Sequence, residues 1–96
     1  MEVLVRPAAA SDINEAYVWY ARRRPELGDE FLAATQSALE RIRTFPARGS
    51  IVHRDTRRIF LERYPYQLLY RIQDDVAIVV ACMHLRRDPS RWQSRT

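Results

Sequence analysis

The sequence predicts an α+β fold in which a hairpin of two helices packs on one face of a mainly antiparallel sheet. Three observations lead to this prediction. Two helical stripes fill the first half of the chain, apolar residues alternate along two segments of the second half, and a third segment there is apolar on both faces. The expected order is β-α-α-β-β-β, with a final helical turn (-α) at the C-terminus. Ninety-six residues are expected to form one domain, 1–96, around a single small core.

A short strand and a first helix are expected at the N-terminus. In residues 1–7, Val3 and Val5 fall on one face of a strand that Pro7 ends. Residues 8–25 follow the spacing of a helix packed on one side, and Pro25 is expected to end it. The stripe of this helix consists of Ile13, Ala16, Tyr17, Tyr20 and Ala21.

A second helix is expected to start at Gly28 or Asp29 and to end before Pro46. Because few residues separate the two helices, we expect them to form an antiparallel hairpin. The buried stripe of the second helix consists of Phe31, Thr35, Ala38, Ile42 and Phe45, widened by Leu32 and Leu39.

The second half of the chain is strand-like after a loop expected at residues 47–56. Residues 57–64 and 66–72 alternate between apolar and polar side chains, and residues 76–83 are apolar on both faces, as expected for a central strand. Asp74 and Asp75 fit a hairpin turn between the last two strands. Residues 88–92 can add a helical turn with Asp88 as its N-cap.

The composition excludes several classes of protein. The longest apolar run, residues 76–83, is far below the roughly 20 residues that cross a bilayer, and residues 1–7 do not resemble a secretion signal. Two glycines cannot build a glycine-rich phosphate loop, and the two histidines match no zinc spacing, so no cofactor, metal or membrane association is expected. Cys82 is expected to be a small buried side chain in a cytoplasmic protein.

The charge is unevenly distributed. All sixteen Lys+Arg residues are arginine, which a genome that favours arginine codons would explain alone. However, residues 1–48 are neutral in net charge, whereas residues 49–96 carry the whole net charge of +4. This asymmetry suggests an anionic partner for the second half. We expect Arg57 or Arg58, together with Arg63 and Arg71, to meet on the sheet face opposite the helix hairpin.

The segment "HLRRDPSRW", residues 84–92, is either a solvated tail or a working surface. In the first interpretation Asp88 neutralises one of Arg86 and Arg87, and Trp92 packs back over the core. In the second the arginines contact a target. His84 is either a proton-transfer group or a hydrogen-bonded structural residue at the end of its strand.

The element order, together with "YPYQLLYRIQDDVAIVVACMHLRRDPSRW", resembles the RelE/ParE toxins of bacterial type II toxin–antitoxin systems. The resemblance covers essentially the whole chain, with "ASDINEAYVWY" similar to the first helix of the family and "LGDEFLAATQSALERI" to the second. Its most specific pieces are Pro65-Tyr66, Tyr70 and the ending His84-x-Arg86-Arg87-Asp88-Pro89-x-x-Trp92.

The resemblance implies a toxin that arrests growth unless a cognate antitoxin, ParD-like or similar, binds it in a hetero-oligomer. RelE-like members cut mRNA in the ribosomal A site, whereas ParE-like members inhibit DNA gyrase without chemistry of their own. Arg86 falls where the ribonuclease branch has a catalytic arginine, but the lysines of that branch have no counterpart, and Trp92 replaces its C-terminal tyrosine. We therefore expect a ParE-like gyrase inhibitor, with a ribosome-dependent mRNA endoribonuclease as the alternative.

Each hypothesis has its own candidate residues. An amphipathic antitoxin helix would lie in an apolar groove on the helix hairpin, unless the side chains there belong to the core. The groove residues would be Tyr17, Tyr20, Phe31 and Leu39. The target-contact residues would be Arg57, Arg58, Arg63, Arg86, Arg87 and Trp92. The catalytic residues of a ribonuclease would be His84, Arg86 and Arg58.

Overall fold

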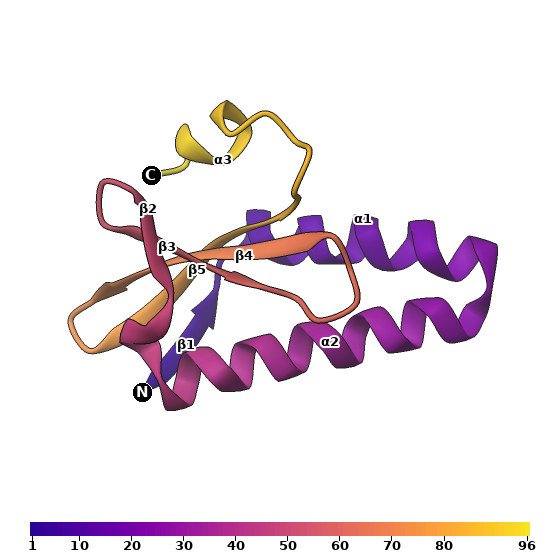
Figure 1. The fold of residues 1–96 in the computed structure, drawn as a ribbon, viewed down its shortest axis with the longest axis horizontal. Helices are drawn as coiled ribbons and strands as arrows, with labels where there is room; N and C mark the ends of the chain where they lie inside the picture. Colours follow the sequence, from indigo (N-terminus) through magenta and orange to yellow (C-terminus); the bar gives the residue numbers. More distant parts are fainter.

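The computed structural model describes all of residues 1–96, and its helix hairpin and sheet form two layers (Figure 1). The five strands make one mixed sheet in the order β1-β5-β4-β3-β2, in which β1 is parallel to β5 and the other pairs are antiparallel. The predicted α+β architecture is confirmed. The elements are β1 (Glu2–Val5), α1 (Pro7–Arg23), α2 (Pro25–Thr44), a 3-10 helix η1 (Pro46–Arg48), β2 (Ser50–His53), β3 (Thr56–Phe60), β4 (Tyr66–Gln73), β5 (Val76–His84) and α3 (Ser90–Gln93).

The helices α1 and α2 form the predicted antiparallel hairpin, and only Arg24 separates them. The start of α2 differs from the prediction, because Pro25 is its first residue and Gly28 already lies inside it. A proline suits the first helical position, where its missing N–H would have no partner in any case. Gly28 faces α1 closely: a Cβ there would lie 2.8 Å from the Ala21 Cβ, so the crossing requires a glycine. None of the helices combines the length and apolar character of a membrane span.

The hairpin covers one face of the sheet, which we call the inner face. Most of its predicted stripe is buried or partly buried and packs against inner-face side chains such as Leu68, Tyr70 and Val79, but Leu32 is 37% exposed. Phe45, which the spacing assigned to the stripe, is instead 49% exposed, because α2 ends at Thr44 and the chain turns into η1. The buried stripe residues of α2 are Phe31, Thr35, Ala38 and Ile42.

The segment expected to be a loop contains η1 and a strand, β2. Ser50 and Ile51 pair with Arg58 and Arg57 of β3, and an irregularity follows before His53. β2 is the edge of the sheet, and Ile51 is 59% exposed. An edge strand with one exposed side need not be apolar, which is why the mixed polarity of this segment hid it.

β5 lies between β1 and β4, as its two-sided apolar composition predicts. Leu69 pairs with Ala81 and Tyr70 with Val79, so Val80 is an extra residue in the ladder. This bulge places both Val80 and Ala81 in the core cluster on the opposite face, which we call the outer face. The expected turn before β5 is confirmed by its two aspartates, whose φ angles are positive as a tight hairpin requires.

Residues 85–96, which we call the strap, run back across the outer face. In Figure 1, α3 lies on the opposite side of the sheet from α2. Trp92 is only 5% exposed and packs with Leu69, Val80 and Met83 in the outer core cluster. The expected helical turn is confirmed, but α3 begins at Ser90 with Pro89 as its N-cap, and the Asp88 carboxylate accepts the backbone N–H of Ser90 at 2.9 Å.

A buried tyrosine fixes the path between the helices and the sheet. The Tyr70 side chain is fully buried, its hydroxyl donates to the Pro46 carbonyl at 2.7 Å, and it accepts the Gly49 N–H at 3.2 Å. Burial raises the pKa of the Tyr70 phenol above its ordinary value. A Cβ at position 49 would collide with this hydroxyl, so the close approach requires Gly49. The two hydrogen bonds of the Tyr70 hydroxyl thus hold η1 and the start of β2 against the sheet.

Tyr70→Phe should therefore lower the free energy of unfolding by about 1–3 kcal/mol, because it leaves a buried donor and acceptor unpaired. Urea unfolding followed by circular dichroism measures the change. Tyr17→Phe, at a partly buried tyrosine of α1, is the control and should change the free energy by less than about 0.5 kcal/mol. Equal effects of the two substitutions would show that the hydroxyl does not pin the loop.

Candidate functional site

A groove of about 950 Å³ lies between α1, the end of β5 and the strap, and we call it the α1–strap groove. One wall is the surface of α1 from Ala8 to Tyr20, and the other is formed by the strap. Aromatic side chains and charged groups of both signs line it. The aromatic residues are Trp19, Tyr20 and Tyr66; the charged residues are Asp12, Glu15, Arg87, Arg91 and Arg95.

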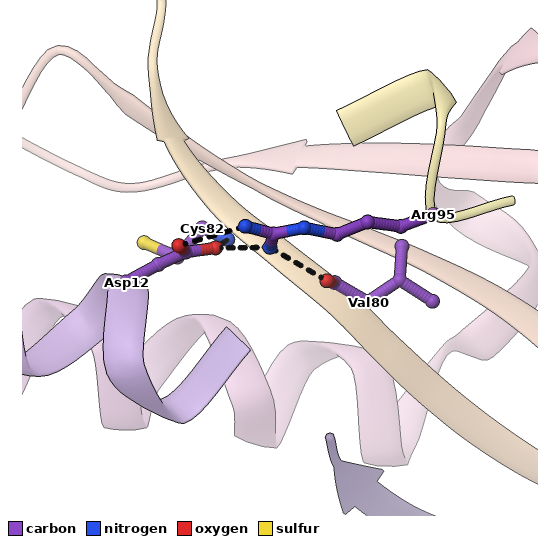
Figure 2. A network of polar contacts seen from close by, with 4 residues as sticks. All are labelled: Asp12, Val80, Cys82 and Arg95. Carbon is purple, nitrogen blue, oxygen red and sulfur yellow. Dashed lines mark hydrogen bonds and ion pairs between the residues drawn. The ribbon is translucent and has the colours of Figure 1, made fainter. Parts of the chain in front are cut away.

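The groove exists because β1 is shorter than β5. β1 ends at Val5, opposite Val79, whereas β5 continues to His84, so no strand of the chain flanks the second half of β5 on this side. Two side chains occupy that position instead (Figure 2). The Asp12 carboxylate accepts the Cys82 N–H at 3.0 Å, and the Arg95 guanidinium donates to the Val80 carbonyl at 3.1 Å.

These two side chains also bind each other. Arg95 donates from Nη1 to Asp12 Oδ2 at 2.6 Å and from Nη2 to Oδ1 at 3.2 Å. Hydrogen bonding to Asp12 raises the pKa of Arg95. The other ion pair of the molecule, Arg43 with Glu40, is an exposed pair within α2. The Asp12–Arg95 pair is thus the one ion pair that joins distant parts of the chain.

Cys82 has no role in nucleophilic chemistry at this site. Its side chain is 2% exposed, and burial raises the pKa of the thiol to about 12. The reactive form of cysteine is the thiolate, which is scarce at neutral pH when the pKa is so high. The prediction of a small buried side chain is confirmed.

His84 lies at the mouth of the groove, on the inner face of the sheet. It pairs with Tyr66, and the two ring centroids are 5.2 Å apart. Its Nδ1 accepts the Arg86 N–H at 3.0 Å. The side chains of Arg86 and Arg87 are exposed. The interpretation in which Asp88 neutralises one of them is wrong, because its carboxylate instead accepts the Ser90 N–H, which lowers the pKa of Asp88.

The arginines of β3 and of the following loop do not share one face. Arg57 pairs with Tyr70 and donates to the carbonyls of Ala47 and Gly49 at 2.9 and 2.8 Å, so it supports the loop. Arg58 pairs with Leu69 and therefore lies on the outer face. Arg63 lines a shallow depression against α2, on the hairpin side. The expected convergence on the outer face holds for Arg58, as the one of Arg57 and Arg58 that faces outward, and is wrong for Arg63.

The outer face retains two arginines. Arg58 and Arg71 alternate with inner-face residues on neighbouring strands, and the Arg58 guanidinium lies 4.9 Å from the centre of the Phe60 ring. Trp92 is buried in the outer core cluster, and its ring is 5.8 Å from that of His53. The expectation that Trp92 offers a surface for contact is therefore wrong, and its indole belongs to the core.

The four residues expected to line an antitoxin groove are not in one place. Phe31 is fully buried, Leu39 packs against the core, and Tyr17 lies against Gly28 between the helices. Tyr20 is the one that reaches the α1–strap groove. Its ring is stacked on Phe31 at 5.5 Å, and burial raises the pKa of its phenol.

Sequence reasoning missed several groove residues. Trp19 is 49% exposed at the groove, and the Arg23 guanidinium lies 3.3 Å from its ring centre. The indication available in the sequence was that Trp19 is an aromatic residue outside the buried stripe of α1. Asp12 and Arg95 carry no such indication, since they meet only in the folded chain.

Comparison with known proteins places this fold in a class. The family model of the "ParE toxin of type II toxin-antitoxin system, parDE" matches residues 3–89. A solved structure from the chromosomal ParDE toxin–antitoxin system from P. aeruginosa is similar to the chain with a TM-score of 0.77 and 19% identity, covering 88% of this chain and 95% of that one. Comparison with curated proteins gives no match by sequence.

The molecule is thus a toxin of the type II toxin–antitoxin class. Within that class the chain belongs to the ParE toxin family, because the family model covers nearly its whole length. The similarity to the solved structure, at its low identity, confirms the fold alone. The resemblance to the RelE/ParE family that the sequence predicted is confirmed.

Proposed function

We propose that the toxin arrests growth by binding DNA gyrase and that a cognate antitoxin neutralises it. The observation that carries the choice of target is the separation of the candidate ribonuclease residues. The His84 side chain lies on the inner face, opposite Tyr66, whereas Arg58 lies on the outer face, opposite Leu69. The sheet itself stands between them.

Phosphodiester cleavage needs both kinds of group at the same phosphate. A general base must come within about 3 Å of the proton that it takes, and a cation must stabilise the charge on the same phosphate. Arginine stays protonated at neutral pH, so it cannot supply the base. With His84 and Arg58 on opposite faces, the arrangement favours binding over catalysis, which supports the gyrase proposal.

The proposed target surface consists of the exposed arginines at the start of the strap and the two on the outer face. Arg86 and Arg87 are exposed, and Arg58 and Arg71 are half-buried. Residues 49–96 carry the whole net charge of +4, so this half of the molecule attracts an anionic partner. Charges at the rim of an interface mainly raise the association rate and select the partner. Arg57, Arg63 and Trp92 are left out of the proposed surface.

The double substitution Arg86→Gln/Arg87→Gln should weaken inhibition of gyrase supercoiling by about tenfold or more, because two cations of the proposed contact are lost. The concentration for half-inhibition in a supercoiling assay measures this. Arg43→Gln/Arg48→Gln, which removes the same charge from exposed arginines elsewhere, should leave inhibition unchanged. Active gyrase at an excess of toxin, in cells that nevertheless stop growing on expression, would refute the target.

The ribosome-dependent ribonuclease is kept as a second candidate by one observation. The Arg86 N–H donates to His84 Nδ1 at 3.0 Å, so the two residues are adjacent at the end of β5. Ribosomes loaded with an mRNA and incubated with the toxin preparation used in the supercoiling assay should keep that mRNA intact. Cleavage in the A site that disappears with His84→Ala would establish the ribonuclease instead.

We further propose that the antitoxin binds in the α1–strap groove through an amphipathic helix. Trp19 is the largest exposed apolar side chain there, and Tyr20 packs edge-on against it at 5.0 Å. The guanidinium of Arg23 covers the Trp19 ring and holds its orientation. A half-exposed, preoriented tryptophan in a groove is typical of a residue that dominates an interface.

Trp19→Ala should therefore weaken antitoxin binding by about tenfold or more, since truncation of such a residue often costs about 2 kcal/mol or more. Isothermal titration with the antitoxin encoded beside the toxin gene measures the dissociation constant. Phe45→Ala is a matched control, because Phe45 is also 49% exposed but lies beyond the end of α2. The groove would be the wrong site if Phe45→Ala weakened binding and Trp19→Ala did not.

A further inference from the structure

The strap is attached to the rest of the molecule by few contacts. The backbone hydrogen bonds donated by residues 87–96 are all local, each reaching back three or four residues. Beyond its first residues, the strap is therefore held by side chains. Trp92 packs into the outer core cluster, and Arg95 binds the Asp12 carboxylate and the Val80 carbonyl.

Several buried polar atoms of the outer face, which the strap crosses, lack a hydrogen-bond partner within the protein. Five buried side-chain polar atoms of the molecule have no hydrogen-bond partner within the protein, and four of them belong to residues that the strand alternation places on the outer face. Thr56 is fully buried and Gln67 is 7% exposed. The four atoms are Thr56 Oγ1, Arg58 Nε, Gln67 Oε1 and Arg71 Nε.

Two free-energy contributions act on the strap in opposite directions. Burial of the Trp92 indole favours the covered state, whereas polar atoms without partners favour return of the outer face to water. Because only side chains hold the strap over this surface, the loss of one further contact makes its opening more frequent. The Asp12–Arg95 pair is that contact, because it is partly buried, doubly hydrogen-bonded and links the strap to α1.

We propose that the strap is a hinged cover of the outer face and that the Asp12–Arg95 pair is its latch. When the latch is broken, the strap leaves the sheet more often, which exposes Trp92 and the part of the outer face that carries Arg58 and Arg71. The cover is a property of the fold and does not depend on which target the toxin binds.

The latch also belongs to the α1–strap groove, because Asp12 and Arg95 both line it. A partner in this groove touches both halves of the latch, and a carboxylate of that partner could replace Asp12 at Arg95. Binding of a partner in the groove therefore changes how often the strap covers the outer face. This step alone rests on the proposed antitoxin site.

The latch is tested in the full-length toxin with Trp19→Phe, which leaves Trp92 as the one tryptophan. Asp12→Asn removes the charge but keeps an oxygen for the Cys82 N–H, and Arg95→Gln removes the other half of the pair. Acrylamide quenching of Trp92 and trypsin cleavage after Arg91 both report opening. Each should increase by about tenfold or more, because hydrogen bonds to charged groups contribute more than neutral ones.

The matched controls are Glu40→Gln and Arg43→Gln, which break the exposed pair of α2 by the same chemistry and should change neither readout. Arg95→Lys should give an intermediate value, because a lysine can pair with Asp12 but cannot make the paired hydrogen bonds. Unchanged quenching and cleavage in both latch variants would overturn the proposal. Cleavage that appears equally after Arg48 would also overturn it, since it would show global unfolding instead of a local opening.

Discussion

The structure depends on one constraint: the strand β5 is apolar on both faces and must be covered on both. Val79 packs under the helix hairpin, while Val80, Ala81 and Met83 belong to the outer core cluster. A hairpin of two helices can cover only one face of the sheet. The second cover is the strap, whose Trp92 brings a large apolar surface to the outer face. The chain thus completes its core with its last residues.

This constraint also decides where the charges of the strap lie. Because Trp92 must reach the sheet, Asp88 binds the Ser90 N–H in the turn before it, and Arg95 is carried across to Asp12 on α1. Arg86 and Arg87 remain exposed at the edge, where they are free to meet a partner. The segment that the sequence left open between a solvated tail and a working surface is therefore both structural and exposed, residue by residue. The assignment of the chain to the ParE toxin family gives these exposed arginines a functional context.

The periodic parts of the fold could be predicted from the sequence, because spacing alone reveals a stripe on a helix or an alternating strand. The start of α2 could not, since a proline can equally end one helix or begin the next. The strand β2 could not either, because it is short, irregular and at the edge of the sheet. The sequence left open whether Arg57 or Arg58 faces outward, because the two neighbours have the same chemistry and only the register decides between them.

The candidate site was less predictable than the fold. The groove follows from the unequal lengths of β1 and β5, and its ion pair joins two residues that are 83 positions apart in the sequence. No local sequence pattern indicates that two such distant residues form a contact. Phe31 illustrates the opposite error, since its spacing fits an exposed groove as well as a core, and the structure buries it fully.

The most direct test of whether the strap is part of the core compares the two tryptophans of the chain. Truncation of Trp92, 5% exposed, should lower the free energy of unfolding by about 3–5 kcal/mol, as for a core residue. Truncation of Trp19, 49% exposed, should lower it by less than about 1 kcal/mol. Both values are read from urea unfolding of the single alanine variants. A loss at Trp92 no larger than that at Trp19 would show that the strap is not part of the core.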